Sequence, residues 1–268
     1  MSDPTYSFER GTLPLLVSMP HVGTQLPPEI AARMTPQARR VPDTDWHLPR
    51  LYDFLQAMGA NLLVAVNSRY VVDLNRDPAG TILYPGASNT ELCPLETFQS
   101  EPIYLPGRAP DAAEIEHRIG RYWRPYHLKL AEELAALKAR HGYALLFDAH
   151  SIKSELPRFF EGRLWDINLG TADGASAAAS IGPALLDAAQ GAGGYSAVLN
   201  GRFKGGYITR TYGAPAAGVH AAQLELSWRT YMDEGGSFAF DEERAQAVRP
   251  ALRAVVEALL TAGARAAG

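Results

Sequence analysis

The sequence lacks the features that would mark several large classes of protein. Its only cysteine among 268 residues is Cys93, so neither an internal disulfide nor a cysteine-based zinc site can form. No apolar run approaches the roughly 20 residues that a membrane-spanning helix needs. The formal net charge is -4, which argues against a nucleic-acid surface. The first residues lack a basic region followed by an apolar stretch, so no signal peptide is expected.

The composition that remains is that of a globular protein. Hydrophobic residues make up 47% of the chain and charged residues 20%. We therefore expect a single domain over residues 1–268 and a cytoplasmic location. The expected partner is a small molecule, with no role for nucleic acid or a membrane. The composition gives no indication of the oligomeric state.

Short apolar segments alternate with amphipathic ones along the chain. Strands are predicted at residues 13–21, 61–66, 69–74, 143–150, 163–170, 195–200 and 219–227. Helices are predicted at residues 45–60, 111–141, 175–190 and 242–264. Pro125 should kink or break the second helix, and the stretch 75–110, rich in proline and glycine, should be an irregular functional loop. This alternation predicts helices packed around a largely parallel sheet, with ligands beyond the carboxyl ends of its strands.

Histidines stand where two of these strands end. His21 follows the first strand, and His150 closes the strand at 143–150, two residues after Asp148. Each histidine alone could be an ordinary core or loop residue. Two at comparable strand ends, with Asp148 placed to bond one of them, favour a metal site, because a catalytic zinc takes three protein ligands and a water.

The third ligand should be a carboxylate, because a single cysteine leaves histidine and carboxylate side chains to hold the metal. Asp43 and Asp45 lie at the start of the helix predicted at 45–60. One of them, or Thr44, could instead cap that helix. Asp45 is the favoured ligand, and Asp43 is the alternative.

Glu225 is the candidate general base. It lies in the middle of the apolar segment VHAAQLELS, where a buried carboxylate is costly unless it has a role. The alternative is an edge-strand residue that faces solvent.

Several cations could bind the carboxylates of an acidic substrate. Arg76 could clamp one carboxylate bidentately, although a structural salt bridge with Asp73 or Asp77 would explain it as well. The segment GRFKGGYITR at 201–210 could reach a second carboxylate through Arg202, Lys204 or Arg210. Solvated loop charges are the alternative interpretation. The sequence contains no P-loop, no GxSxG elbow and no HExxH helix.

Taken together, long segments of the chain resemble the N-formylglutamate amidohydrolases, also called N-formylglutamate deformylases. The resemblance covers about residues 12–235 and rests on PHVG (20–23), DTDWHLPRLYDF (43–54), SRYVVDLNR (68–76), LYPG (83–86), YWRPYH (122–127), DAHSIKS (148–154), NGRFKGGYITRTYG (200–213) and VHAAQLEL (219–226). It implies a zinc-carboxypeptidase-like fold of the phosphorylase/hydrolase-like kind. That fold is a three-layer α/β/α sandwich with a mixed, mainly parallel sheet.

The resemblance also implies an activity, the hydrolysis of N-formyl-L-glutamate to L-glutamate and formate in histidine degradation. His21, Asp45 and His150 would hold Zn²⁺ or another divalent metal. Glu225 would be the general base, and the pair Asn75 and Arg76 would hold a substrate carboxylate. Arg76 is also a catalytic candidate, because the metal and an arginine would stabilise the oxyanion. Carboxypeptidases have a glutamate ligand three residues after the first histidine, where this chain has Thr24.

Other functions fit the same residues. A deacylase acting on other N-acyl amino acids, or a carboxypeptidase, would need the same metal and base. Turnover of formyl, acetyl and peptide substrates would separate these enzymes. A non-catalytic protein that binds acidic metabolites is the alternative from another class, and failure to bind metal would favour it.

Overall fold

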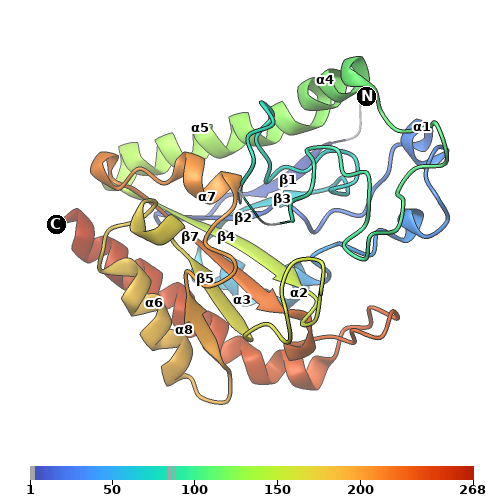
Figure 1. Cartoon of the computed structure of the whole chain (residues 1–268). Helices are drawn as coiled ribbons and strands as arrows, with labels where there is room; N and C mark the ends of the chain where they lie inside the picture. Colours follow the sequence, from blue (N-terminus) through green and yellow to red (C-terminus); the bar gives the residue numbers. More distant parts are fainter. Residues whose placement is uncertain (1–3, 84–85, 87) are drawn as a thin grey trace.

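The centre of the molecule is a mixed β-sheet, seen in a computed structural model that describes residues 4–83, 86 and 88–268. The described strands form one seven-stranded sheet in the order β1-β3-β2-β4-β7-β5-β6 (Figure 1). They are β1 (Tyr6–Glu9), β2 (Leu15–Met19), β3 (Asn61–Ala65), β4 (Ala144–Ile152), β5 (Ile167–Gly170), β6 (Ala197–Leu199) and β7 (Val219–Ser227). The pairs β1–β3 and β5–β7 are antiparallel and the other neighbouring pairs are parallel. The expected mixed, mainly parallel sheet is confirmed.

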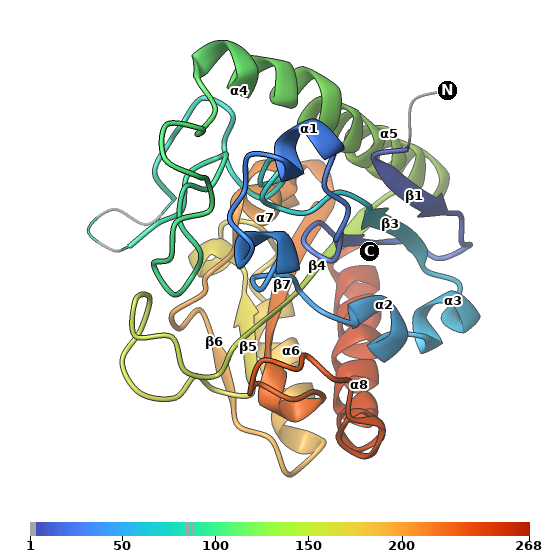
Figure 2. The same cartoon turned by 90° about the vertical axis from the view of Figure 1, so that its right-hand side faces the viewer.

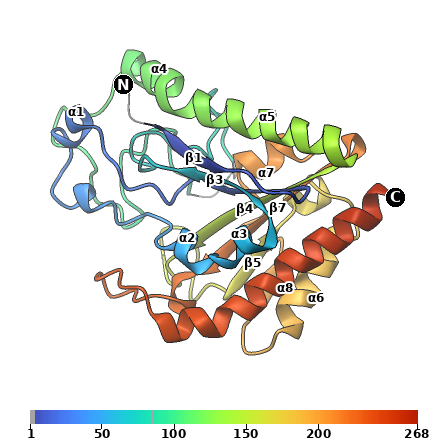
Figure 3. The same ribbon diagram turned by 180° about the vertical axis from the view of Figure 1, so that it is seen from behind.

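Helices cover both faces of this sheet. One face packs against α5 (Arg124–His141) and α7 (Tyr207–Tyr212), and the other against α3 (Phe54–Met58), α6 (Ile181–Gly191) and α8 (Glu242–Ala267) (Figures 1 and 3). Successive strand residues point to opposite faces, so Leu16 packs on the α5 side while Leu15 and Val17 pack on the α8 side. Because both faces are buried, the central strands are continuous apolar runs. The predicted three-layer α/β/α sandwich is confirmed.

Most of the long elements were predicted correctly. Strand β7 has the predicted bounds, and α8 extends the predicted helix by a few residues. The helix expected at 111–141 is present as α4 (Ala112–Arg118) and α5, joined by a π-type turn at Ile119–Trp123. Pro125 lies in the first turn of α5, where its missing N–H costs little. None of these helices, nor any other in the described part of the chain, is long and apolar enough to cross a membrane.

The strand predicted at 69–74 is wrong, because this segment forms consecutive turns. Its carbonyl groups are bonded to a side chain rather than to a neighbouring strand. The buried Arg118 guanidinium donates from Nη1 to the carbonyls of Val71 at 3.0 Å and Tyr70 at 3.4 Å. The apolar residues of the segment are buried, which explains why their pattern looked like that of a strand.

The helix predicted at 45–60 is also corrected. It forms two short helices, α2 (Leu48–Leu51) and α3, after a turn in which His47 has a positive φ of 62°. Within the described chain no side chain caps α2. The amide of Asp45 instead donates to the carbonyl of His21 at 3.0 Å, so the local structure holds Asp45 beside the end of β2.

Other elements were missed or shortened. Strand β1 and the helices α1 (Pro28–Ala31) and α7 had no prediction, and α6 begins six residues later than expected. The stretch predicted as an irregular loop has no helix or strand in its described part, and the LYPG motif lies partly outside the described residues. Residues 88–110 lie beside the loop 153–165 (Figure 2). The rings of Phe98 and Phe159 meet between these two segments, with their centroids 5.1 Å apart.

Candidate active site

The candidate site lies at the carboxyl ends of three adjacent parallel strands, β2, β4 and β7. His21 follows β2 by two residues, while His150 on β4 stands directly opposite Glu225 on β7. The turn after His21 needs a glycine, because a Cβ at Gly23 would lie 2.3 Å from the carbonyl oxygen of Asn67. Neighbouring strand ends thus gather residues that are far apart in the sequence.

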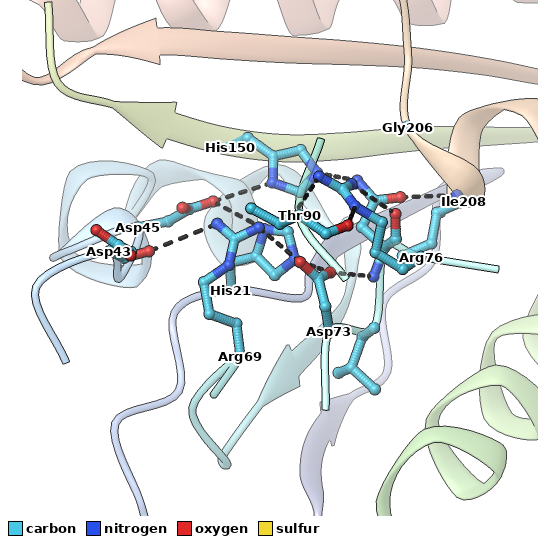
Figure 4. Close-up of polar contacts among 12 residues, drawn as sticks. His21, Asp43, Asp45, Arg69, Asp73, Arg76, Thr90, His150, Gly206 and Ile208 are labelled. Carbon is cyan, nitrogen blue, oxygen red and sulfur yellow. Dashed lines mark hydrogen bonds and ion pairs between the residues drawn. The ribbon is translucent and has the colours of Figure 1, made fainter. Parts of the chain in front are cut away.

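His21, Asp45 and His150 form a buried trio, shown in Figure 4. Each offers one potential ligand atom, and these atoms all lie within 4.8 Å of one another. The Nδ1 atom of His150 lies 3.0 Å from Asp45 Oδ2, and the Nδ1 atom of His21 lies 3.8 Å from the same oxygen. Both imidazoles therefore turn the same nitrogen towards one carboxylate.

The opposite nitrogen of each imidazole is bonded to a second carboxylate. Nε2 of His21 lies 2.7 Å from Asp73 Oδ1, and Nε2 of His150 lies 3.0 Å from Asp148 Oδ2. An ionised carboxylate can only accept, so Nε2 of His21 carries the proton. Such a bond orients the ring of a metal-binding histidine and leaves the lone pair of Nδ1 available. His150 instead lies between two carboxylates, one at each ring nitrogen, which favours a proton on both nitrogens.

The charges around the trio shift the pKa values of its members. Burial lowers the pKa of His21, and the guanidinium of Arg69 lowers it further. Burial also opposes the charged form of His150, but the carboxylates of Asp148 and Asp45 raise its pKa well above the ordinary value. Burial would raise the pKa of Asp73, yet His21 and Arg69 hold it well below its usual range. These shifts show a dense set of opposite charges that water does not screen.

This arrangement fits a divalent metal ion. Two imidazole Nδ1 atoms and one carboxylate oxygen converge, and nitrogen and oxygen donors of this kind are what zinc takes in catalytic sites. Carboxylates already hold the far side of both rings. A cation between the three donors would also balance the buried negative charge of Asp45.

Asp43, the alternative ligand, is bonded elsewhere. Its Oδ2 accepts a hydrogen bond from the Tyr70 hydroxyl at 2.6 Å and one from the Phe98 amide at 2.8 Å. Burial raises the pKa of Asp43 to about 6. The geometry therefore favours Asp45 as the third donor, with Asp43 anchoring the loop that carries Phe98.

Glu225 lines the same cavity as the trio, which we call the active-site cavity. The Glu225 side chain is buried, and burial raises its pKa to about 8, with His150 opposing and Asp45 reinforcing the shift. A group that exchanges a proton near neutral pH suits general acid–base catalysis.

Arg69 is a site residue that the sequence prediction missed. It lines the active-site cavity, is buried, and donates from Nη2 to Asp73 Oδ2 at 2.7 Å. Its Nε is buried and has no hydrogen-bond partner among the described residues. The spacing of Arg69 and Asp73, four residues apart in SRYVVDLNR, was the available signal, but the predicted strand would have placed the two far apart.

The predicted carboxylate-binding residues separate into two groups. Arg76 and Arg202 line the active-site cavity; Arg76 also donates to the hydroxyl and carbonyl of Thr90. Lys204 and Arg210 are not among the described residues that line it. Lys204 pairs with the exposed Asp173 at 3.0 Å, and Arg210 is an exposed residue of α7.

Asn75 also lines the cavity, but its amide is bonded to the protein. Oδ1 accepts from the amide of Ile208 at 2.8 Å, and Nδ2 lies 3.0 Å from His150 Nε2 and 3.4 Å from Asp148 Oδ2. The geometry therefore gives Asn75 a part in orienting His150, while the contact with a substrate carboxylate that the resemblance implied stays a prediction.

Comparison with known proteins gives a consistent result. Residues 13–232 match the family described as N-formylglutamate amidohydrolase. The chain is 52% identical over 261 residues to N-formylglutamate deformylase of Pseudomonas aeruginosa, covering 97% of this chain and 98% of the other. It is 47% identical to N-formylglutamate deformylase of Pseudomonas putida, covering 98% of each. The crystal structure of N-formylglutamate amidohydrolase from Ralstonia eutropha superposes with a TM-score of 0.78 at 27% identity, covering 96% of this chain and 97% of that one.

Proposed function

The chain belongs to the N-formylglutamate amidohydrolase family, and from that premise we propose that it hydrolyses N-formyl-L-glutamate to L-glutamate and formate with the help of a divalent metal ion. This would be a step of histidine degradation. His21, Asp45 and His150 would hold the ion, with zinc the first choice. The observation that carries this proposal is that one potential ligand atom from each of the three residues lies within 4.8 Å of the others.

The chain's own groups provide the proton transfers. A bound divalent ion would polarise the formyl carbonyl and lower the pKa of an attacking water. Glu225 accepts a proton from the water that attacks the formyl carbon, and then donates it to the nitrogen of the leaving amine. The nitrogen leaves as the amino group of glutamate, and the formyl carbon leaves as formate. Asp73 and Asp148 bind the Nε2 side of the two imidazoles, so that each ring turns its Nδ1 towards Asp45.

Three arginines can bind the negative charges of the substrate. Arg76 and Arg202 line the active-site cavity and would each bind one carboxylate of N-formylglutamate. Arg69 has a buried Nε near the trio, with no hydrogen-bond partner among the residues that the structure describes. It would stabilise the negative charge that develops on the formyl oxygen.

The direct test of the activity is a product assay on purified protein. We expect equal amounts of formate and glutamate from N-formyl-L-glutamate, with far slower turnover of N-acetylglutamate and of peptides. Removal of metal with a chelator should abolish turnover, and Zn²⁺ should restore it. If zinc-loaded protein releases no formate, the proposed reaction is wrong. If fully metal-free protein keeps its rate, the proposed metal is wrong.

Substitution of the arginines tests the recognition of two carboxylates. Arg76→Lys and Arg202→Lys keep the charge but lose the planar fork. Each should lower kcat/KM for N-formylglutamate by roughly ten- to a hundredfold, the value of a charged hydrogen bond. One of these two variants should also reduce the preference for N-formylglutamate over N-formylglutamine, which lacks one carboxylate.

Lys204→Gln is the matched control, since Lys204 lies outside the active-site cavity and pairs with Asp173. This variant should keep the wild-type rate and the wild-type preference. A loss of preference in Lys204→Gln, with none in the two arginine variants, would assign the second carboxylate to Lys204, another cation of the 201–210 segment.

A further inference from the structure

A second cavity lies beside the active-site cavity and shares a wall with it. Its volume is about 310 Å³, against about 70 Å³ for the active-site cavity. Pro42, Leu156, Trp228 and Phe238 form the apolar part of its lining, and polar or charged residues such as Arg40 and Glu234 form the rest. Among the described residues that line the two cavities, Phe98 is the one that both share. The free space next to the site is therefore behind this ring.

Phe98 is held in place from several sides. Its amide donates to Asp43 Oδ2 at 2.8 Å, and its ring meets that of Phe159 edge-on at 5.1 Å. The guanidinium carbon of Arg69 lies 4.7 Å from the centre of the same ring. The side chain is only 8% exposed. A ring packed in this way forms a fixed partition, because a shift would break contacts with all three neighbours.

The second cavity lies on the side of the trio where Asp43 stands. It is lined by Asp43 and Lys153, which are two residues from Asp45 and three from His150 in sequence. Arg76 and Arg202 line only the active-site cavity. Figure 4 shows Asp43 and Arg76 on opposite sides of the His21–His150 pair. A substrate whose carboxylates meet Arg76 and Arg202, and whose amide meets the trio, would extend its acyl group away from these arginines, on the side where Asp43 and the second cavity lie (Figure 4).

From this geometry, and on the basis of the function proposed above, we infer that Phe98 limits the acyl group to formyl by closing off the second cavity. A formyl carbon carries only a hydrogen, so it fits in front of the ring. Any longer acyl group adds carbon atoms where the ring stands. The apolar walls behind the ring would accept an alkyl chain once the ring is removed.

The test measures kcat/KM for N-formyl-, N-acetyl- and N-butanoyl-L-glutamate in the zinc-loaded enzyme. Phe98→Ala should raise the butanoyl-to-formyl ratio by roughly tenfold or more, since a misfit of one methylene in an apolar pocket changes selectivity about 10–200-fold. Phe98→Leu should give a smaller shift of the same ratio in the same direction. It provides the test if the alanine variant folds poorly. Adding Leu156→Phe to Phe98→Ala should refill the second cavity and reduce the gain.

Phe160→Ala is the control. Phe160 packs against the hydrophobic cluster that contains Phe98, and its ring contacts that of Phe203. It lines neither of the two cavities. Its ratio should equal that of the wild type. If wild-type enzyme cleaves the formyl substrate while Phe98→Ala and Phe98→Leu keep the wild-type ratio, the inference is overturned and the proposed function stands. If wild-type enzyme releases no formate, the proposed function itself has failed.

Discussion

Replacing Glu225 with Gln is expected to lower kcat by roughly 10²–10⁴-fold, the usual contribution of a general base. The substitution keeps the shape of the side chain and removes its ability to take a proton. Glu225 is buried opposite His150, and its pKa is raised to about 8, so no solvent-exposed carboxylate can replace it at that place. The measurement is steady-state turnover of N-formylglutamate, with metal content and thermal unfolding recorded on the same sample.

Glu161→Gln is the comparison variant for this experiment. Glu161 is an exposed residue of the loop 153–165 and would be the next glutamate to consider as a base. Its replacement should leave kcat within about twofold of the wild type, as expected for a surface change. Near wild-type turnover in Glu225→Gln, with intact metal, would contradict the assignment of the base.

Replacing either His21 or His150 with Ala is expected to remove the metal and the activity together. Each substitution takes away one of three convergent donors and leaves Asp73 or Asp148 without its buried partner. Purified wild-type protein should contain about one divalent ion per chain, and each variant should contain close to none by elemental analysis. Asp45→Asn should behave in the same way.

Two controls make this result specific. His117→Ala removes an exposed histidine of α4 and should keep the full metal content. Asp43→Asn should also keep the metal, because the Asp43 carboxylate bonds Tyr70 and Phe98 outside the trio. Full metal occupancy in both His21→Ala and His150→Ala would contradict the ligand assignment. Loss of metal in Asp43→Asn alone would exchange the roles of the two aspartates.

The sequence predicted the elements whose environment is uniform along their length. Strands β4 and β7 are buried on both faces, so both are rich in apolar residues, with polar residues towards their carboxyl ends. His150 and Glu225 stood out for that reason, and the rule for parallel sheets placed them at the same edge. The family resemblance added the expected reaction, hydrolysis of N-formylglutamate, which the apolar pattern alone does not indicate.

The failures occurred where side chains replace regular backbone pairing. The segment 69–74 has strand-like composition, but Arg118, nearly 50 residues away in the sequence, bonds its carbonyl groups. Asp45 looked like a helix cap, yet its amide is bonded to His21 instead. Long-range contacts of this kind leave no local pattern. Arg69 and Phe98 were missed for the same reason, since their roles depend on neighbours from distant loops.

The site is built partly from strands of the sheet and partly from connecting segments, and this division affects how such enzymes diverge. His150 and Glu225 are fixed on paired central strands, where a one-residue slip would turn both away from the cavity. Arg76, Arg202 and Phe98 lie on connecting segments outside the sheet. Insertions and substitutions are tolerated far better in connecting segments than in a buried sheet. Descendants of one ancestral hydrolase can therefore acquire new substrates by altering these segments, while the bond-breaking centre is inherited unchanged.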